Sequence, residues 1–138
     1  MSPYGPFTIE RWSHQPWVVV WDPEGFPDQG CHAFLNFWAW QDVSPQRLRR
    51  WASQLADAWT WLRVMGYDWP EASLDVWSHW AFCQLATPTA VRSLARHVET
   101  LYQFYAFWHW YDPRRVPRQP WPRDPRERER WLLHLANP

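Results

Sequence analysis

Apolar residues recur at helical spacing along most of this chain. The clearest stretch covers residues 44–63, where one face carries Leu48, Trp51, Ala52, Leu55, Trp59 and Leu62. Ser44 can cap this helix, Pro45 suits its first turn, and Gly66 can end it in the left-handed conformation. The pattern predicts a helix with one apolar face and one polar face.

A second two-faced pattern covers residues 89–110. Its apolar positions follow steps of four and three along the chain, at Leu94, Val98, Leu101, Tyr105 and Trp108. Shorter apolar patterns predict helices over residues 31–42 and 73–86, and the signals for another helix start at Asp124 and Pro125. We therefore predict an all-α fold of four main helices, followed by the start of a truncated C-terminal helix.

The two ends of the chain show other patterns. Residues 17–21, "WVVVW", are typical of a short strand, but no partner strand is evident, so residues 1–30 are predicted to form an extended N-terminal arm. Residues 112–125 hold five prolines among charges of both signs, which is typical of a stiff linker. The predicted organisation is an arm over 1–30, a helical domain over 31–111, and a Pro-rich linker with a truncated helix over 112–138.

Charge divides the chain into blocks, although the formal net charge is zero. Residues 44–63 carry four Arg against one Asp, a net +3, and residues 92–138 carry nine Arg against five acids, a net +4. These blocks coincide with the two-faced helices. Most such faces are ordinary solvated surface, and a basic set that is entirely Arg also fits the codon bias of a GC-rich genome, but grouped arginines at helix N-termini can also bind phosphates.

Several kinds of chemistry lack their motifs. The six His show no metal-ligand spacing, neither Cys lies in a CxxC, and the four Gly form no phosphate-binding loop, so no metal site or cofactor is predicted. The sequence has no signal peptide and no apolar run of about 18 residues. We expect a cytoplasmic protein with reduced thiols and no membrane partner.

Two segments resemble one family. "SPQRLRRWASQLADAWTWL" is similar to the second helix of the core-binding (SAM-like N-terminal) domain of tyrosine recombinases, or phage-type integrases, and "RSLARHVETLYQFYAFWHW" resembles the last helix of that domain. The segment between them, "GYDWPEASLDVWSHW", looks like the family's bridge into its third helix, and the resemblance covers residues 17–110. The family pattern has Thr, Asp, Phe and Asn where this chain has Arg47, Gln54, Ala58 and Ala95.

The resemblance implies a four-helix SAM-like bundle that grips double-stranded DNA as one jaw of a clamp, with other recombinase protomers as further partners. The family's catalytic domain has no counterpart in this sequence, which contains no Lys and no His-x-x-Arg, so no enzymatic activity is expected. The candidate DNA contacts lie on the two long helices, most of them on the polar faces. They are Ser44, Arg47, Arg49, Arg50, Ser53, Thr89, Arg92, Ser93, Arg96 and His97.

Two other hypotheses compete with this one. The 15 Trp could serve a protein–protein interaction module that has kept a recombinase fold and lost DNA binding, which an exposed patch including Trp61, Trp110 or Trp121 would favour. A small-molecule binder would instead need a cavity lined by aromatic residues.

Overall fold

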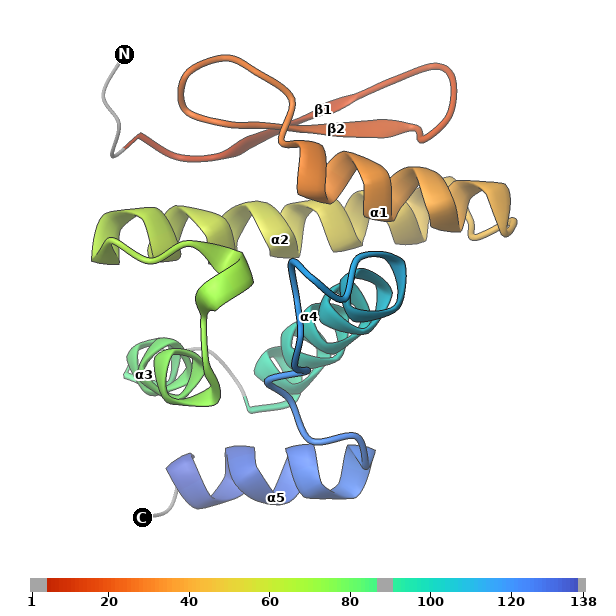
Figure 1. Ribbon diagram of the computed structural model, residues 1–138. Coiled ribbons are helices and arrows are strands. Elements are labelled where there is room, and N and C mark those ends of the chain that lie inside the picture. The colour runs from red at the N-terminus through yellow and green to blue at the C-terminus, as the bar shows by residue number, and fades with distance from the viewer. Residues whose placement is uncertain (1–4, 87–90, 137–138) are drawn as a thin grey trace. The chain divides into compact units, whose positions relative to one another are not determined.

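The computed structural model of the chain describes residues 5–86 and 91–136 (Figure 1). It is 63% helical, and its described residues form five α-helices and one two-stranded sheet. The mainly helical fold class is therefore confirmed. The chain divides into two compact units, Met1–Tyr67 and Asp68–Pro138, a division that lies within the single helical domain predicted over residues 31–111.

The first unit packs a β-hairpin and a short helix against one long helix. Its elements are β1 (Thr8–Arg11), β2 (Val18–Trp21), α1 (Gln29–Trp40) and α2 (Pro45–Met65). The strands are antiparallel, with Thr8 opposite Trp21 and Arg11 opposite Val18. The expectation of an unpaired strand was wrong. The pattern concealed β1 because all four of its residues are exposed and only one is apolar, whereas the three valines of β2 are buried.

The ends of α2 have the capping geometry that the sequence predicted. The Ser44 hydroxyl accepts a hydrogen bond from the Arg47 N–H at 3.2 Å, and Pro45 follows at the first helical position. At the other end Gly66 has φ 81°, and the Tyr67 N–H donates to the Leu62 carbonyl at 2.9 Å. This left-handed residue stops the helix and satisfies carbonyls of its last turn.

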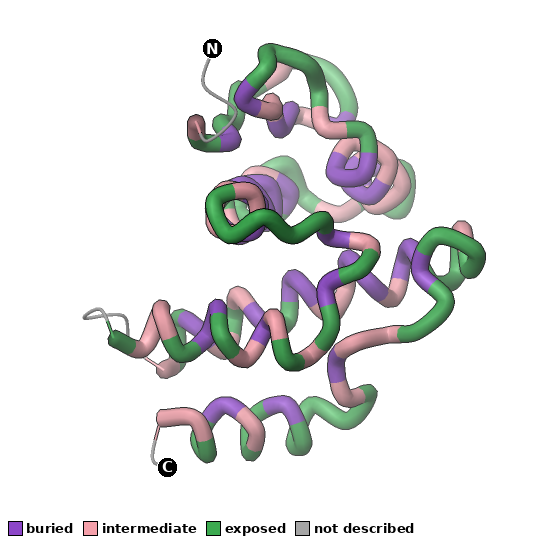
Figure 2. Tube along the Cα trace, turned by 60° about the vertical axis from the view of Figure 1, so that its left-hand side comes forward, coloured by how far each residue is buried: buried purple, intermediate pink, exposed green. Residues whose placement is uncertain are grey.

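The second unit is built from the 3₁₀ turn η1 (Trp69–Glu71) and the helices α3 (Leu74–Leu85), α4 (Val91–Tyr111) and α5 (Pro125–Ala136), which pack pairwise. Buried and exposed positions alternate along α4 and α5, so each helix has one face toward the core (Figure 2). The Tyr105 hydroxyl, fully buried in this core, donates to the Trp69 carbonyl at 2.6 Å. Burial raises the pKa of Tyr105 well above its ordinary value, so the hydroxyl stays protonated.

Residues 112–125 differ from the predicted stiff linker. Val116 and Trp121 are almost completely buried, and the Trp121 ring lies 5.7 Å from Trp77 and 5.2 Å from Trp131 between ring centres. Residues 125–136 form a helix packed on α3 and α4. The prolines restrict the backbone of this segment, and its two buried side chains, Val116 and Trp121, anchor it to the helices. The segment therefore contributes to the core of the second unit.

Candidate nucleic-acid interface

Three arginines occupy the first two turns of α2, and we call them the α2 basic patch: Arg47, Arg49 and Arg50. Arg47 and Arg50 are exposed, and the Arg47 guanidinium lies 5.6 Å from the centre of the Trp51 ring. Arg49 is half-buried, and its Nε is buried with no hydrogen-bond partner among the described residues. Ser44 and Ser53 are exposed nearby, and the Ser44 hydroxyl is already used by the cap. The patch therefore offers guanidinium groups to solvent.

The charge of the α2 basic patch is not neutralised by neighbouring acids. The first turn of α2 contains no acidic residue, and the helix dipole adds partial positive charge at the same end. Two ion pairs formed by described residues, Arg63 with Glu24 and Arg128 with Glu99, do not include the patch. An anion approaching this end of α2 would meet uncompensated positive charge.

The candidate residues on α4 fall into two groups. Arg92, Ser93 and Arg96 are exposed, and Arg92 and Arg96 lie one turn apart; we call these two arginines the α4 basic pair. His97 is half-buried, and its ring meets Trp80 of α3 edge to face at 5.0 Å, so it lies toward the core. Thr89 falls outside the described residues. The two arginines are thus exposed to solvent, whereas His97 packs against Trp80.

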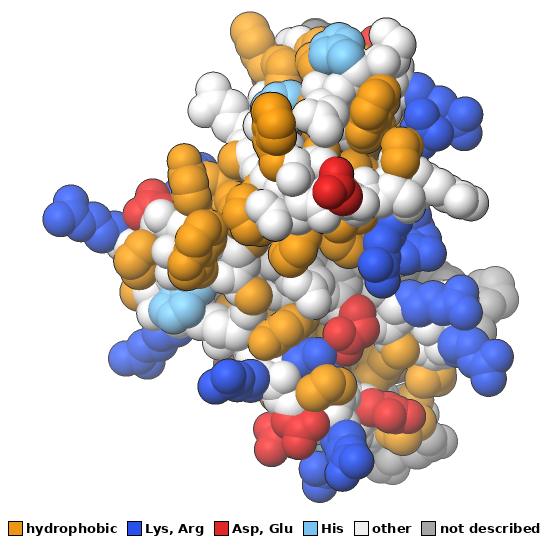
Figure 3. Space-filling model, turned by 90° about the vertical axis from the view of Figure 1, so that its right-hand side faces the viewer, with side chains coloured by type: hydrophobic (Ala, Val, Ile, Leu, Met, Phe, Trp, Pro, Cys, Tyr) orange, Lys and Arg blue, Asp and Glu red, His pale blue; other side chains and the backbone are white. Residues whose placement is uncertain are grey.

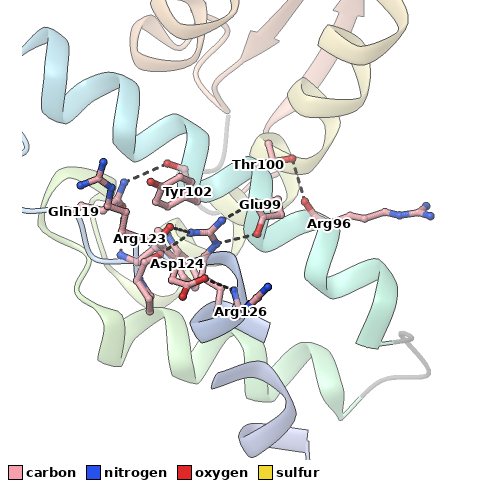
Figure 4. Close-up of polar contacts among 11 residues, drawn as sticks. Arg96, Glu99, Thr100, Tyr102, Gln119, Arg123, Asp124 and Arg126 are labelled. Atoms are coloured by element: carbon pink, nitrogen blue, oxygen red, sulfur yellow. Dashed lines mark hydrogen bonds and ion pairs between the residues drawn. The ribbon is translucent and has the colours of Figure 1, made fainter. Parts of the chain in front are cut away.

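Glu99 does not neutralise Arg96, although it lies one turn further along α4. Both of its carboxylate oxygens accept hydrogen bonds from Arg128 of α5, from Nε and from Nη2, at 2.9 Å each. Figure 4 shows Arg96 extending away from this cluster while Glu99 faces into it. Glu99, which is close to Arg96 in sequence, is thus paired with Arg128.

Nothing in the sequence predicted the structural role of Arg128. Its side chain is buried, its Nη1 donates to the carbonyls of Pro122 and Arg123 at 2.6 and 2.9 Å, and its guanidinium lies 3.9 Å from the centre of the Tyr102 ring (Figure 4). It joins α5 to α4 and to the segment before α5. Its surroundings in sequence, "RERER", gave no signal, because alternating charges are typical of a solvated helix face.

A hollow of about 320 Å³ lies between α4 and α5, beside the α4 basic pair. Its wall combines Arg92 and Arg96 with Val98, Leu132 and the acid Glu129, and no described aromatic residue lines it. It therefore lacks the aromatic lining that the small-molecule hypothesis requires.

No protein-family model matches this sequence, and no curated protein or solved structure matches it. The likeness to recombinase core-binding domains thus depends on the sequence pattern of residues 17–110 alone.

The exposure of the aromatic residues supports the hypothesis of a protein–protein interaction module only in part. Trp121 is buried and Trp61 is half-buried, with its ring stacked near Tyr67 at 6.4 Å. Trp110 is 67% exposed and Tyr111 62%, both at the end of α4. Figure 3 shows hydrophobic side chains at the surface together with arginines, and acidic side chains next to arginines in its lower part, the level of α5. One exposed aromatic cluster therefore exists on the second unit.

The described residues also bear on metals and membranes. Among residues 5–86 and 91–136, no three His, Cys, Asp or Glu side chains come together as a metal site would require. Within the same residues, no helix combines the length and the apolar character that crossing a bilayer demands.

Proposed function

We propose that this protein binds duplex DNA through its backbone phosphates, as a core-binding domain of the tyrosine recombinase kind, with no catalytic activity of its own. The observation that carries the proposal is a difference between two groups of arginines. The two arginines held in ion pairs join parts of the same unit, whereas those of the α2 basic patch and the α4 basic pair have no acidic partner among the described residues.

The local geometry supports phosphate contacts. Arg is suited to phosphate because its planar guanidinium can donate two parallel hydrogen bonds, and the N-terminus of a helix favours an anion. The α2 basic patch combines both features. Because phosphate contacts carry no sequence information, they position the protein on a duplex and do not select a site.

The finer parts of the proposal concern fold and context. We propose that α1 to α4 correspond to the four helices of a SAM-like bundle, that DNA and other recombinase protomers are the partners, and that the protein works in the cytoplasm. The free thiols of Cys31 and Cys83 support a reducing compartment.

The test is the affinity of the protein for a short fluorescein-labelled duplex, measured by fluorescence anisotropy at low salt. The double substitution Arg47→Ala with Arg50→Ala should weaken binding by about tenfold or more, because two charge-assisted contacts are lost. Arg92→Ala with Arg96→Ala should do the same for the second unit, and Arg50→Ala with Arg96→Ala removes one guanidinium from each unit.

The matched control is Arg126→Ala with Arg130→Ala, which removes two exposed arginines of α5 and changes the net charge equally. Affinity in this control should stay near that of the unaltered protein. Equal losses in all of the double variants would mean that bulk charge governs binding, and the proposed interface would then be wrong.

The aromatic end of α4 favours a second candidate function, the binding of a second copy of this chain. Trp110 and Tyr111 are exposed, and their ring centres lie 6.4 Å apart next to Phe107. Aromatic side chains of this kind are enriched in protein interfaces. Concentration-dependent self-association in sedimentation velocity, lost on Trp110→Ser with Tyr111→Ser, would support this function; a monomer at all concentrations would contradict it.

A further inference from the structure

The second unit contains a basic hollow that no candidate DNA contact lines. It has a volume of about 570 Å³ and lies between the start of α3 and the segment that follows α4. Three arginines of that segment, Arg114, Arg115 and Arg118, line it, and Ser73 and Leu74 of the α3 start form part of the opposite wall. We call it the loop hollow.

The segment that carries these arginines is fixed at several points. Val116 and Trp121 are buried, and the Val116 carbonyl lies 2.7 Å from Nδ1 of His109. The Gln119 amide donates to the Tyr102 carbonyl at 3.3 Å. The apolar residues of the segment anchor it, so its arginines project from a defined backbone, which lowers the entropy lost when a ligand binds.

Arg115 is held in place more strongly than the other two arginines. Its guanidinium lies 4.9 Å from the centre of the Trp69 ring and 5.2 Å from that of Trp108. An arginine can stack on an aromatic face and still donate hydrogen bonds from its edge. The indoles therefore orient Arg115 without consuming its donors.

Charge in the loop hollow favours an anion. Three guanidinium groups line it against one carboxylate, that of Glu71, and none of the four takes part in an ion pair among the described residues. The Ser73 side chain makes no capping hydrogen bond to α3 and is exposed, so its hydroxyl is available as a donor. The net positive charge and the planar donors match a tetrahedral dianion best.

We propose that the loop hollow is a phosphate-binding site formed by Arg114, Arg115 and Arg118. Its ligand is a phosphate group, carried either by a nucleic-acid backbone or by a small phosphorylated molecule. The site shares no residue with the α2 basic patch or the α4 basic pair, so it does not depend on the proposed DNA interface.

The experiment uses the full chain and inorganic phosphate as the probe. Arginine Nε–Hε resonances are followed by NMR while sodium phosphate replaces sodium chloride at constant ionic strength. The resonances of Arg114, Arg115 and Arg118 should shift together and saturate. Arg114→Gln with Arg118→Gln should weaken phosphate binding by roughly tenfold or more, since two charge-assisted contacts are lost; both residues are exposed.

The control Arg126→Gln with Arg130→Gln removes the same charge from α5 and should leave phosphate affinity unchanged. Shifts that appear equally on arginines outside the loop hollow, or equal affinity in both double variants, would overturn the proposal. A short duplex added to the phosphate-saturated protein distinguishes the sources: displacement of phosphate indicates a nucleic-acid phosphate, and unchanged resonances indicate a small phosphorylated ligand.

The Arg47→Ala, Arg50→Ala protein separates this proposal from the DNA interface. It should bind inorganic phosphate as tightly as the unaltered chain. If the unaltered protein binds phosphate but not DNA, the proposed function is wrong and the loop hollow remains supported. If the unaltered protein binds DNA but not phosphate, only the loop-hollow proposal is wrong.

Discussion

At the scale of single residues, arginine has three different environments in this protein. Arg128 is buried and bonded to a carboxylate and two carbonyls, Arg115 is stacked on two indoles, and Arg50 is exposed with no acidic partner among the described residues. Since a buried charge requires partners, Arg128 has a structural role. The same residue type thus holds the fold together in one place and is available to a ligand in another.

The two cysteines should differ in reactivity because their surroundings differ. Cys31 is fully buried at the start of α1, and burial, followed by the nearby Asp28 carboxylate, raises the pKa of its thiol. A helix N-terminus usually lowers the pKa of a thiol, but burial outweighs that effect here. Cys83 is only half-buried.

We therefore expect the native protein at pH 8 to react with one equivalent of a disulfide reagent, at Cys83. Native Cys83→Ser protein should react more than about tenfold more slowly than native Cys31→Ser protein, because the thiolate is the nucleophile and that of Cys31 is disfavoured. Urea should expose the second thiol. Equal rates in the two native variants would contradict the prediction.

The raised pKa of Cys31 also affects stability. The free energy of unfolding should fall as pH rises above the ordinary thiol pKa, since the Cys31 thiol then loses its proton in the unfolded chain and keeps it in the folded one.

At the scale of elements, a segment could be predicted from the sequence where its own pattern of residues determines its structure. The two long helices, the Ser44 cap and the Gly66 stop follow from local sequence, and the structure contains all of them. β1 and the segment 112–125 were missed, because their structure depends on partners distant in sequence. An exposed strand without apolar alternation becomes visible only when β2 lies beside it, and Trp121 becomes core only against Trp77.

The candidate site shows the same limit. Helical periodicity placed Arg50, Arg92 and Arg96 on exposed faces, which the structure bears out. The resemblance to the recombinase family made His97 a candidate contact, but whether that side chain can reach a ligand depends on Trp80 of a different helix. The pairing of Glu99 with Arg128 spans 29 residues and could not be predicted from either helix alone.

Trp121→Ala tests whether the proline-rich segment belongs to the core. Trp121 is 2% exposed and contacts indoles of both α3 and α5, so its loss should lower the free energy of unfolding by about 3–5 kcal/mol. Urea titration followed by tryptophan fluorescence measures this value. Arg118→Ala, an exposed position in the same segment, should change it by less than about 0.5 kcal/mol. A small effect at Trp121 would show that the segment is a linker after all.

At the scale of the whole molecule, a net charge of zero conceals local excesses of positive charge. Acidic residues concentrate in other parts of the chain, so DNA binding would depend on particular arginines and not on overall attraction. Each phosphate that an arginine neutralises releases condensed counterions, and the salt dependence of the affinity counts such contacts.

If the five arginines of the α2 basic patch and the α4 basic pair each contact one phosphate, the logarithm of the DNA association constant should fall against the logarithm of salt concentration with a slope of about −4.5. Arg47→Ala with Arg50→Ala should make this slope shallower by about 2. Anisotropy titrations at four or more salt concentrations provide the measurement. A slope near zero in the unaltered protein would exclude phosphate contacts of this number.

Four tryptophans of the second unit form a continuous series from Trp80 through Trp77 and Trp121 to Trp131, with ring centres 5.4, 5.7 and 5.2 Å apart in turn. Electronic transitions of indoles this close couple to one another and produce circular dichroism of their own in the far ultraviolet, superimposed on the signal of the peptide groups. An optical estimate of helix content would therefore be biased for this protein. The same coupling offers a spectroscopic marker for the second unit, since it disappears once the indoles separate, whether or not the helices have melted.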